Sequence, residues 1–209
     1  MKDYTQNGEQ AHVLAALAVP YDESIARAFC QGIRVLEIGA WNAEDKSNSR
    51  ALIEFGASAI LIEPSPVPLA GLARFYCGNE KVGIIGAAIT PAGGMLQLEI
   101  TDDAVSAPVG TDHEVWREKG GYYGIITVPS IAVADFVEQF GSFDFVSIDT
   151  EGTSVEVFAA LIATGMRPRC ICLEHDGRVV EVAGIAEAAS YRQVHLNGTN
   201  VVLQWKSGL

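Results

Sequence analysis

The stretch VLEIGAWNAEDKSN, residues Val35 to Asn48, decides the class of fold. It begins as an apolar strand that runs into Glu37 and Gly39, where dinucleotide-binding folds continue with a glycine-rich phosphate-binding turn. Here Trp41 and a polar run follow instead, and the next glycine is Gly56. Without the missing glycines the backbone cannot closely approach a pyrophosphate. The stretch therefore predicts a nucleotide-type turn for a ligand without a pyrophosphate.

Strand and helix patterns alternate along the rest of the chain. Short apolar strands are predicted over residues 33–38, 59–62, 82–89, 143–148 and 170–173. Helices are predicted over residues 9–30 with an interruption near Pro20, 47–55, 67–76, 130–140 with Ser130 as N-cap, 153–164 and 179–190. Apolar strands that alternate with helices indicate an α/β fold, in which a mostly parallel sheet has helices on both faces.

The middle and the end of the chain depart from this alternation. Residues 191–196 and 199–205 are predicted strands on either side of Asn197-Gly198, a strong signal for a two-residue antiparallel hairpin. Residues 95–100 and 124–128 are also predicted strands, and the polar stretch from Asp102 to Gly121 between them is either a lid over a ligand site or a surface loop. We expect one domain over residues 1–209, which begins with a helical segment over residues 1–31.

The net charge limits the kinds of partner, and the cysteines bear on the cellular compartment. The chain has 26 acidic and 14 basic residues, a formal charge of −12, which argues against nucleic acid and anionic membranes as partners. No stretch has the roughly 20 apolar residues of a membrane span, and the N-terminus lacks the apolar core of a secretion signal. The four cysteines form no CxxC pair and are expected to be free thiols. We therefore expect a cytoplasmic protein, whose oligomeric state the sequence does not reveal.

Acidic residues follow the predicted strands. In an open α/β sheet, ligands bind beyond the carboxyl ends of the strands. Four of the five strand ends carry an acid there, and the third ends at two alanines: Glu37, Glu63, Ala87 and Ala88, Asp149 with Glu151, and Glu174 with His175. Acids that complement helix dipoles explain one or two of these positions. They explain Glu63 and Glu174 less well, because each directly ends an apolar run.

The position of Glu63 points to an adenosine ligand. It lies 24 residues after Gly39, near the spacing at which an acid accepts hydrogen bonds from ribose hydroxyls. The absent glycines disfavour NAD, and with it a nicotinamide-dependent oxidoreductase. S-adenosylmethionine has the same adenosine, but a sulfonium and an amino acid in place of phosphates. Its cationic centres suit an acid-lined cleft.

The motifs VLEIGAWNAEDKSNSRALIEFGASAILIEPSP, IIGAAIT, GGMLQLEI, FDFVSIDTEGTSVEVF and CICLEHDG together resemble the FkbM-type methyltransferases. These form a branch of the class I S-adenosylmethionine-dependent enzymes, and the resemblance runs from about Val35 to Leu203. It implies a three-layer, Rossmann-like sheet of seven strands that ends in an antiparallel hairpin. It also implies methyl transfer from S-adenosylmethionine to a hydroxyl of a small molecule or sugar.

The resemblance also implies roles for individual residues. Glu37, Gly39 and Ala40 would form the turn under the methionine part of the cofactor, and Ser47 with Asn48 would open the first helix after it. Glu63, followed by Pro64, would hold the ribose. Ala88 would lie near the adenine, and Asp149 would lie beside the transferring methyl group.

Trp41 is a further candidate for the cofactor site. Its ring could cover the adenine, or it could contact the sulfonium through a cation–π interaction. The alternative is that it packs under the first helix of the fold.

Transfer to a hydroxyl also needs a base. The candidates are Asp149, Glu151, Glu174 and His175, of which His175 is favoured because imidazole titrates near neutral pH. The alternative for His175 is a hydrogen bond to a neighbouring loop. Asp149 and Glu151 could also bind a divalent cation with Glu174 or His175, but these residue types alone do not define a site, so the metal stays unknown.

One departure from the family pattern supports a second hypothesis. Relatives commonly have a glycine after a small polar residue, where this sequence has Asn42 and Ala43. This difference favours the alternative that the protein keeps the fold without turnover and acts as a binding or assembly partner.

Overall fold

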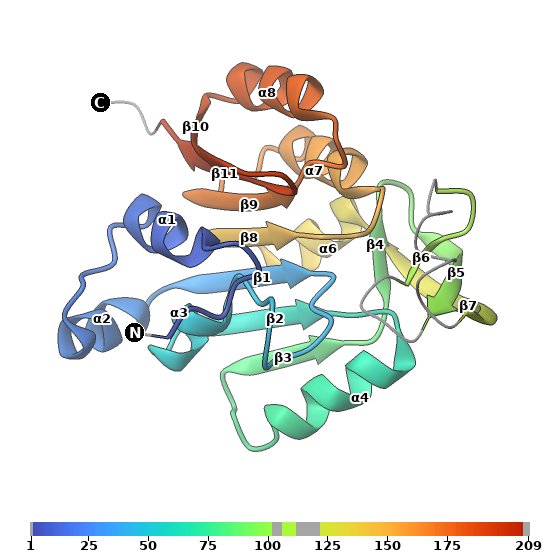
Figure 1. Cartoon of the computed structure of the whole chain (residues 1–209), viewed down its shortest axis with the longest axis horizontal. Coiled ribbons are helices and arrows are strands. Elements are labelled where there is room, and N and C mark those ends of the chain that lie inside the picture. The colour runs from blue at the N-terminus through green and yellow to red at the C-terminus, as the bar shows by residue number, and fades with distance from the viewer. Residues whose placement is uncertain (1, 102–105, 112–121, 207–209) are drawn as a thin grey trace.

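The computed structural model describes residues 2–101, 106–111 and 122–206 and is built around a seven-stranded sheet (Figure 1). From edge to edge the strands are β10 (Tyr191–Leu196), β11 (Asn200–Trp205), β9 (Cys170–Glu174), β8 (Phe145–Ile148), β1 (Arg34–Ile38), β2 (Ser58–Ile62) and β3 (Val82–Ile85). Strands β9, β8, β1, β2 and β3 are parallel to one another, and β11 is antiparallel to both β9 and β10. This order confirms a mostly parallel sheet with an antiparallel C-terminal hairpin.

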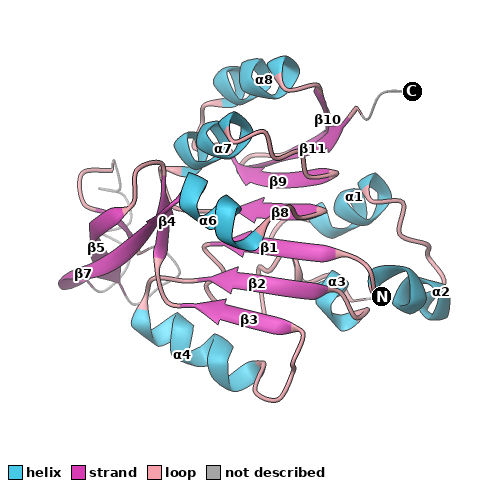
Figure 2. Ribbon diagram, turned by 180° about the vertical axis from the view of Figure 1, so that it is seen from behind, coloured by secondary structure: helices cyan, strands magenta, loops and turns pink. Residues whose placement is uncertain are grey.

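Helices cover both faces of this sheet (Figure 2). The first face is covered by α1 (Glu9–Ala16), α2 (Glu23–Cys30), α3 (Arg50–Glu54) and α4 (Pro66–Phe75). The second face is covered by α6 (Val133–Phe140), α7 (Ser154–Ala163) and α8 (Val179–Ala188). The predicted three-layer, Rossmann-like architecture is therefore confirmed. None of the described helices has the length and apolar character needed to cross a bilayer.

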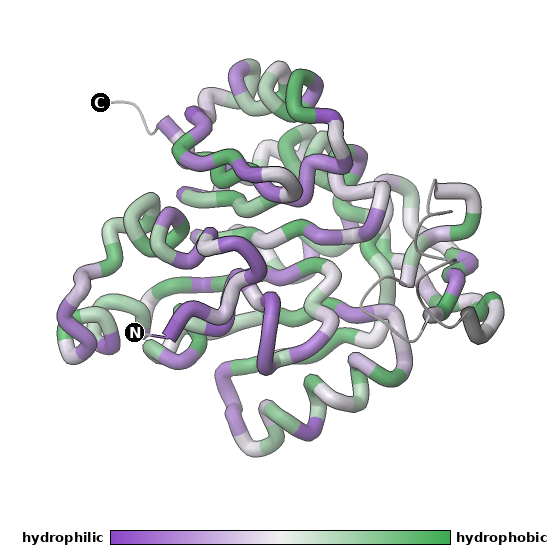
Figure 3. Tube along the Cα trace, viewed as in Figure 1, coloured by the Kyte–Doolittle hydropathy of each residue, from purple (hydrophilic) through white to green (hydrophobic). Residues whose placement is uncertain are grey.

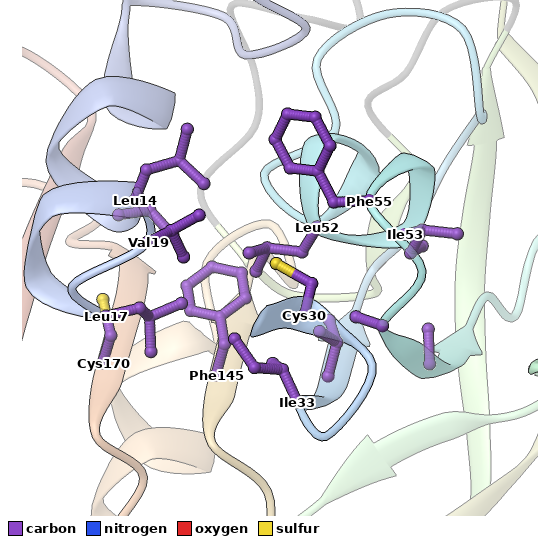
Figure 4. Close-up of a cluster of buried hydrophobic side chains, with 14 of the residues drawn as sticks. Leu14, Leu17, Val19, Cys30, Ile33, Leu52, Ile53, Phe55, Phe145 and Cys170 are labelled. Carbon is purple, nitrogen blue, oxygen red and sulfur yellow. The ribbon is translucent and has the colours of Figure 1, made fainter. Parts of the chain in front are cut away.

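Alternating side chains along each strand build the two core layers. Val35 and Phe145 belong to the first layer, where Leu14, Leu17 and Leu52 lie with Phe145 (Figure 4). The residues that follow them in their strands belong to the second layer. Hydrophobic residues accordingly concentrate along the central strands, whereas the N-terminal stretch is hydrophilic (Figure 3). Burial of both faces explains why these strands are apolar almost without interruption.

A second, four-stranded sheet lies beyond the carboxyl ends of the parallel strands (Figure 1). Its strands are, in spatial order, β4 (Ala88–Thr90), β7 (Tyr122–Ala132), β5 (Gly94–Thr101) and β6 (Ala107–Pro108). The prediction of one strand over residues 82–89 is therefore wrong, because the chain leaves the central sheet after β3. A Cβ atom at Gly86 would lie 2.7 Å from Leu69 Cδ2 of α4, so glycine permits a close passage at the break.

Two helices begin later than predicted. Ser130 is not an N-cap but a residue of β7, where it pairs with Ala88 and Gly94, and α6 begins at Val133. Ladder hydrogen bonds on both sides of β7 hold this segment extended. Helix α3 begins at Arg50, not at residue 47, because residues 47–49 instead form hydrogen bonds with the buried carboxylate of Glu37.

The predicted hairpin is present, but its turn spans residues 197–199. The Asn197 side chain accepts hydrogen bonds from the backbone N–H groups of Thr199 and Asn200, at 2.9 and 2.7 Å. Most of the predicted lid, residues 102–105 and 112–121, lies outside the described residues. The described part of that stretch contributes β6, which pairs with β5.

Candidate active site

A cleft of about 660 Å³ opens at the carboxyl ends of β1, β2, β8 and β9 and is bounded by the second sheet. The residues from the strand ends that line it are Gly39, Trp41, Glu63, Pro64, Ala87, Ala88, Asp149, Glu151, Glu174 and Asp176. From the second sheet, Leu96, Leu98 and Pro108 add an apolar wall. The cleft therefore has acidic residues at the strand ends and an apolar wall on the side of the second sheet.

The turn after β1 is fixed by close backbone packing at Gly39. Its φ is +79°, a left-handed conformation that favours glycine. A Cβ atom there would lie 1.6 Å from the carbonyl oxygen of Asp149, at the end of the neighbouring strand β8. The N–H groups of Gly39 and Ala40 both donate to the carbonyl of Ile62, at 2.9 and 3.0 Å. One glycine therefore suffices here because its role is to bring strand ends together.

Glu63 ties the two turns of the cleft floor to each other. One carboxylate oxygen accepts the backbone N–H of Trp41 at 2.8 Å, and the other accepts the N–H of Ser65 at 2.7 Å. The side chain is buried, and burial raises the pKa of its carboxyl. A carboxylate has about four lone-pair positions, so two backbone donors leave acceptor capacity toward the cleft.

The loop that lacks the family glycine is organised by its own side chains. Asn42 accepts the backbone N–H groups of Glu44 and Asp45 at 2.8 and 2.9 Å, which makes a local Asx-type turn. Lys46 lies with its ammonium 4.9 Å from the centroid of the Trp41 ring. The cation over Trp41 is thus a residue of the same loop, and both side chains line the cleft.

Glu37 faces away from the cleft. Its carboxylate accepts the hydroxyls of Ser47 and Ser49 and the backbone N–H of Asn48. Asn48 in turn donates through Nδ2 to Ser147 Oγ at 3.1 Å. Burial raises the pKa of Glu37 to about 7. The network joins β1, β8 and the loop before α3, so these residues support the cleft from behind.

Acids from two adjacent strands meet on one wall of the cleft. Asp149 and Glu151 follow β8, and Glu174 ends β9, which pairs with β8 in parallel. One carboxylate oxygen from each of the three lies within 4.8 Å of the others. Burial, followed by the charge of Asp149, raises the pKa of Glu174, and burial also raises the pKa of Asp149.

Asp176 lies in the cleft beside these acids, and its backbone has a strained, left-handed conformation. Its Oδ1 accepts the N–H of Gly152 at 3.0 Å, and burial raises the pKa of its carboxyl. Six described non-glycine residues have a positive φ, and four of them line the cleft: Trp41, Lys46, Glu151 and Asp176. Such strain concentrates at functional sites because the surrounding structure must hold it.

His175 is buried outside the cleft. Its Nε2 donates to the carbonyl of Asn197 at 3.2 Å, and its Nδ1 accepts the N–H of Gly177 at 3.1 Å. Both ring nitrogens therefore contact backbone of neighbouring loops. This geometry corresponds to the alternative interpretation of His175, a hydrogen bond to a loop, and leaves no ring nitrogen to face an acceptor.

The structure divides the candidate residues into two groups. Those that line the cleft are Gly39, Trp41, Glu63, Pro64, Ala88, Asp149, Glu151 and Glu174. Those that lie behind it are Glu37, Ala40, Ser47, Asn48 and His175. Hydrogen bonds hold the Glu37 and His175 side chains away from the cleft. Side chains two residues apart along a strand share a face, so the position of Glu174 could have pointed to Asp176 in place of His175.

Further lining residues had no sequence signal of their own. Lys46, Arg178 and Thr199 reach the cleft from three separate loops, and Gln6 reaches it from the N-terminal segment. Arg178 is held by Glu156 and Glu181, through contacts of 2.6 and 2.8 Å.

Comparison with known proteins assigns the family. The family model of the methyltransferase FkbM domain matches residues 37–189, which include every strand end at the cleft. The chain belongs to the FkbM methyltransferase family. No curated protein matches it significantly.

One solved structure of a methyltransferase FkbM shares the fold of this chain. The methyltransferase FkbM from Methylobacillus flagellatus KT superposes on 97% of this chain with a TM-score of 0.54 and 11% identity. Only 62% of that protein is covered, so this FkbM chain spans less than two thirds of its relative's length. The putative methyltransferase yhhF from Escherichia coli, also 11% identical, gives a TM-score of 0.49 over 99% of this chain and 90% of its own.

Proposed function

We propose that this FkbM-family protein transfers a methyl group from S-adenosylmethionine to a hydroxyl of a small molecule or sugar. The observation that carries the proposal is the position of Glu63. It directly follows β2, beside the Gly39 turn and in the same cleft as Asp149. Adenosine ligands of α/β folds are held by an acid at this place.

The cleft suits a cofactor that is cationic and lacks phosphates. Its volume of about 660 Å³ is in the range of small-molecule sites. Glu63 retains lone pairs for ribose hydroxyls, and the small side chains of Ala87 and Ala88 leave room for a flat base. The acids along the rim favour a sulfonium and an ammonium over a pyrophosphate.

When bound, S-adenosylmethionine supplies an electrophilic methyl group on a sulfonium. The remaining work falls to residues of the chain. Asp149 accepts the proton of the acceptor hydroxyl in this proposal, and its raised pKa and its position in the cleft support that role. Leu96, Leu98 and Pro108 exclude water from one side and offer an apolar surface to the acceptor. Glu174 and Glu151 lie beside Asp149 and complete the acidic wall.

A reducing compartment, the cytoplasm, is part of the same proposal. All four cysteines are free, and three of them are buried: Cys30, Cys170 and Cys172.

Calorimetry with purified protein tests the proposal. We expect S-adenosylmethionine and S-adenosylhomocysteine to bind with micromolar affinity and NADH to show no heat of binding. Absence of binding at millimolar S-adenosylmethionine would remove the support for methyl transfer and favour the non-catalytic alternative. NADH binding without binding of the methyl donor would instead favour an oxidoreductase.

A further inference from the structure

The acidic wall of the cleft has the geometry of a cation site. Ile148 and Leu173 are register partners in β8 and β9, so the next residues, Asp149 and Glu174, leave the sheet side by side. Glu151 joins them from the loop after β8. One carboxylate oxygen of each lies within 4.8 Å of the other two. Ligands of one hard cation, bound at about 2.0–2.6 Å, lie at most about 4–5 Å apart across the ion.

A separate observation concerns the oxygens that have no partner. Asp149 Oδ1 and Glu174 Oε2 are fully buried, and within the described ranges neither accepts a hydrogen bond. Almost all buried polar atoms in proteins have a partner, because an unpaired one is costly. Two acceptor oxygens on neighbouring carboxylates need a positive group between them, which is either a cation or a shared proton.

The nearby cationic side chains do not fill that place. Arg178 contacts Glu156 and Glu181, and the Lys46 ammonium lies over the Trp41 ring. Neither Asp149 nor Glu174 forms an ion pair with a described lysine or arginine. A protein-derived counter-charge is thus not in contact with the two unpaired oxygens.

We propose that Asp149, Glu151 and Glu174 bind one divalent cation, Mg²⁺ or Mn²⁺, at the wall of the cleft. Carboxylate oxygens are the ligands these ions prefer, and Mg²⁺ commonly keeps open or water-filled positions beside one to a few carboxylates. All three residues line the cleft, where an acceptor hydroxyl oxygen could enter the coordination shell. This last assignment rests on the proposed function.

The cation would assist transfer by lowering the pKa of the bound hydroxyl. The hydroxyl proton passes to the Asp149 carboxylate, through the oxygen that does not bind the cation. The oxygen then forms a bond to the methyl carbon while the carbon–sulfur bond breaks, and that electron pair stays on sulfur. The acceptors favoured by this arrangement are neutral hydroxyl compounds, such as polyols and sugars, which supply oxygen ligands.

Electron paramagnetic resonance with Mn²⁺ as the only added ligand tests the site directly. The full chain, first stripped with a chelator, should bind one Mn²⁺ per chain, and Mg²⁺ should displace it. Asp149→Asn and Glu174→Gln should each weaken Mn²⁺ binding at least tenfold. The matched control is Glu138→Gln, which removes one negative charge from an exposed position of α6 and should leave Mn²⁺ affinity unchanged.

The outcomes separate this inference from the proposed function. No Mn²⁺ binding to the wild-type chain at millimolar concentration overturns the cation site and leaves a shared proton as the group between the carboxylates. An equal loss in Glu138→Gln also overturns it. The wild-type titration alone can overturn the cation site, so a variant that fails to fold does not make the test inconclusive. Glu151→Gln is a third variant whose Mn²⁺ affinity should fall. Cofactor calorimetry in the presence of a chelator tests the function independently.

Discussion

Gly39 and Asp149 touch through their backbones: a methyl group at position 39 would lie 1.6 Å from the Asp149 carbonyl oxygen. This contact joins the ends of β1 and β8 and places the Asp149 side chain in the cleft. Gly39→Ala should therefore displace Asp149, and the residue also needs the left-handed backbone that φ of +79° requires. We expect a loss of about 3 kcal/mol or more in the free energy of unfolding.

The matched control for that change is Gly71→Ala in α4. An added Cβ at Gly71 meets no heavy atom within 4 Å, and its backbone is helical. Denaturant unfolding should show this variant unchanged or stabilised by about 0.5–1 kcal/mol. Equal stability of the two variants would mean that the Gly39–Asp149 contact does not constrain the site.

Glu63 is expected to hold the cofactor ribose. Glu63→Ala removes the acceptor of the Trp41 and Ser65 N–H groups as well as the proposed hydroxyl contacts. Calorimetry should show S-adenosylhomocysteine binding weakened at least tenfold, since a hydrogen bond to a charged group contributes about 1.5–3 kcal/mol. Glu80→Ala, at an exposed position, is the control. Wild-type affinity in Glu63→Ala would disprove the ribose assignment.

Asp149 and His175 should behave differently when removed. Asp149→Asn keeps the shape of the side chain but not its basicity, so transfer of labelled methyl to a hydroxyl acceptor should fall about a hundredfold or more. His175→Ala leaves the Asn197 carbonyl and the Gly177 N–H without partners, so it should lower the free energy of unfolding by about 1–3 kcal/mol. A folded His175→Ala protein that has lost transfer would restore His175 as the base.

Glu37 should make stability depend on pH near neutrality. Its folded-state pKa is about 7, above its ordinary value of 4.5, so the native state binds more protons than the unfolded state between these values. Its contribution to stability is therefore largest at low pH and declines as pH rises through 7. Relative to Glu37→Gln, the wild type should lose about 2 kcal/mol between pH 5 and pH 8 in denaturant unfolding. A pH-independent difference would show that Glu37 does not titrate in this range.

Much of the fold could be predicted because local pattern and tertiary packing agree. The strands that form the centre of the sheet are buried on both faces, and their apolar runs are visible in the sequence. The second sheet was not predictable as such, because it pairs Ala88–Thr90 with residues about 40 positions away. A short strand at that separation leaves no local trace, and the apolar run through Gly86 conceals the break.

The candidate site was predictable at the strand ends and less so beside them. Glu63 and Asp149 directly follow buried strands and Glu174 ends one, so the parallel sheet brings them to one edge. Glu37 lies one residue before the end of β1, and its side chain points into the first helix layer. The family resemblance, which implied a place under the cofactor, did not indicate this direction. The contact of Lys46 with Trp41 depends on the conformation of the loop, so the spacing of residues in the sequence could not predict it.

The most direct measurement is a crystal structure of the protein soaked with S-adenosylhomocysteine. We expect the ribose hydroxyls to lie within hydrogen-bond distance of Glu63, with the adenine against Ala88 and the thioether on the side of Asp149. An S-adenosylhomocysteine molecule bound elsewhere, or a cleft that stays empty at saturating ligand, would contradict this expectation.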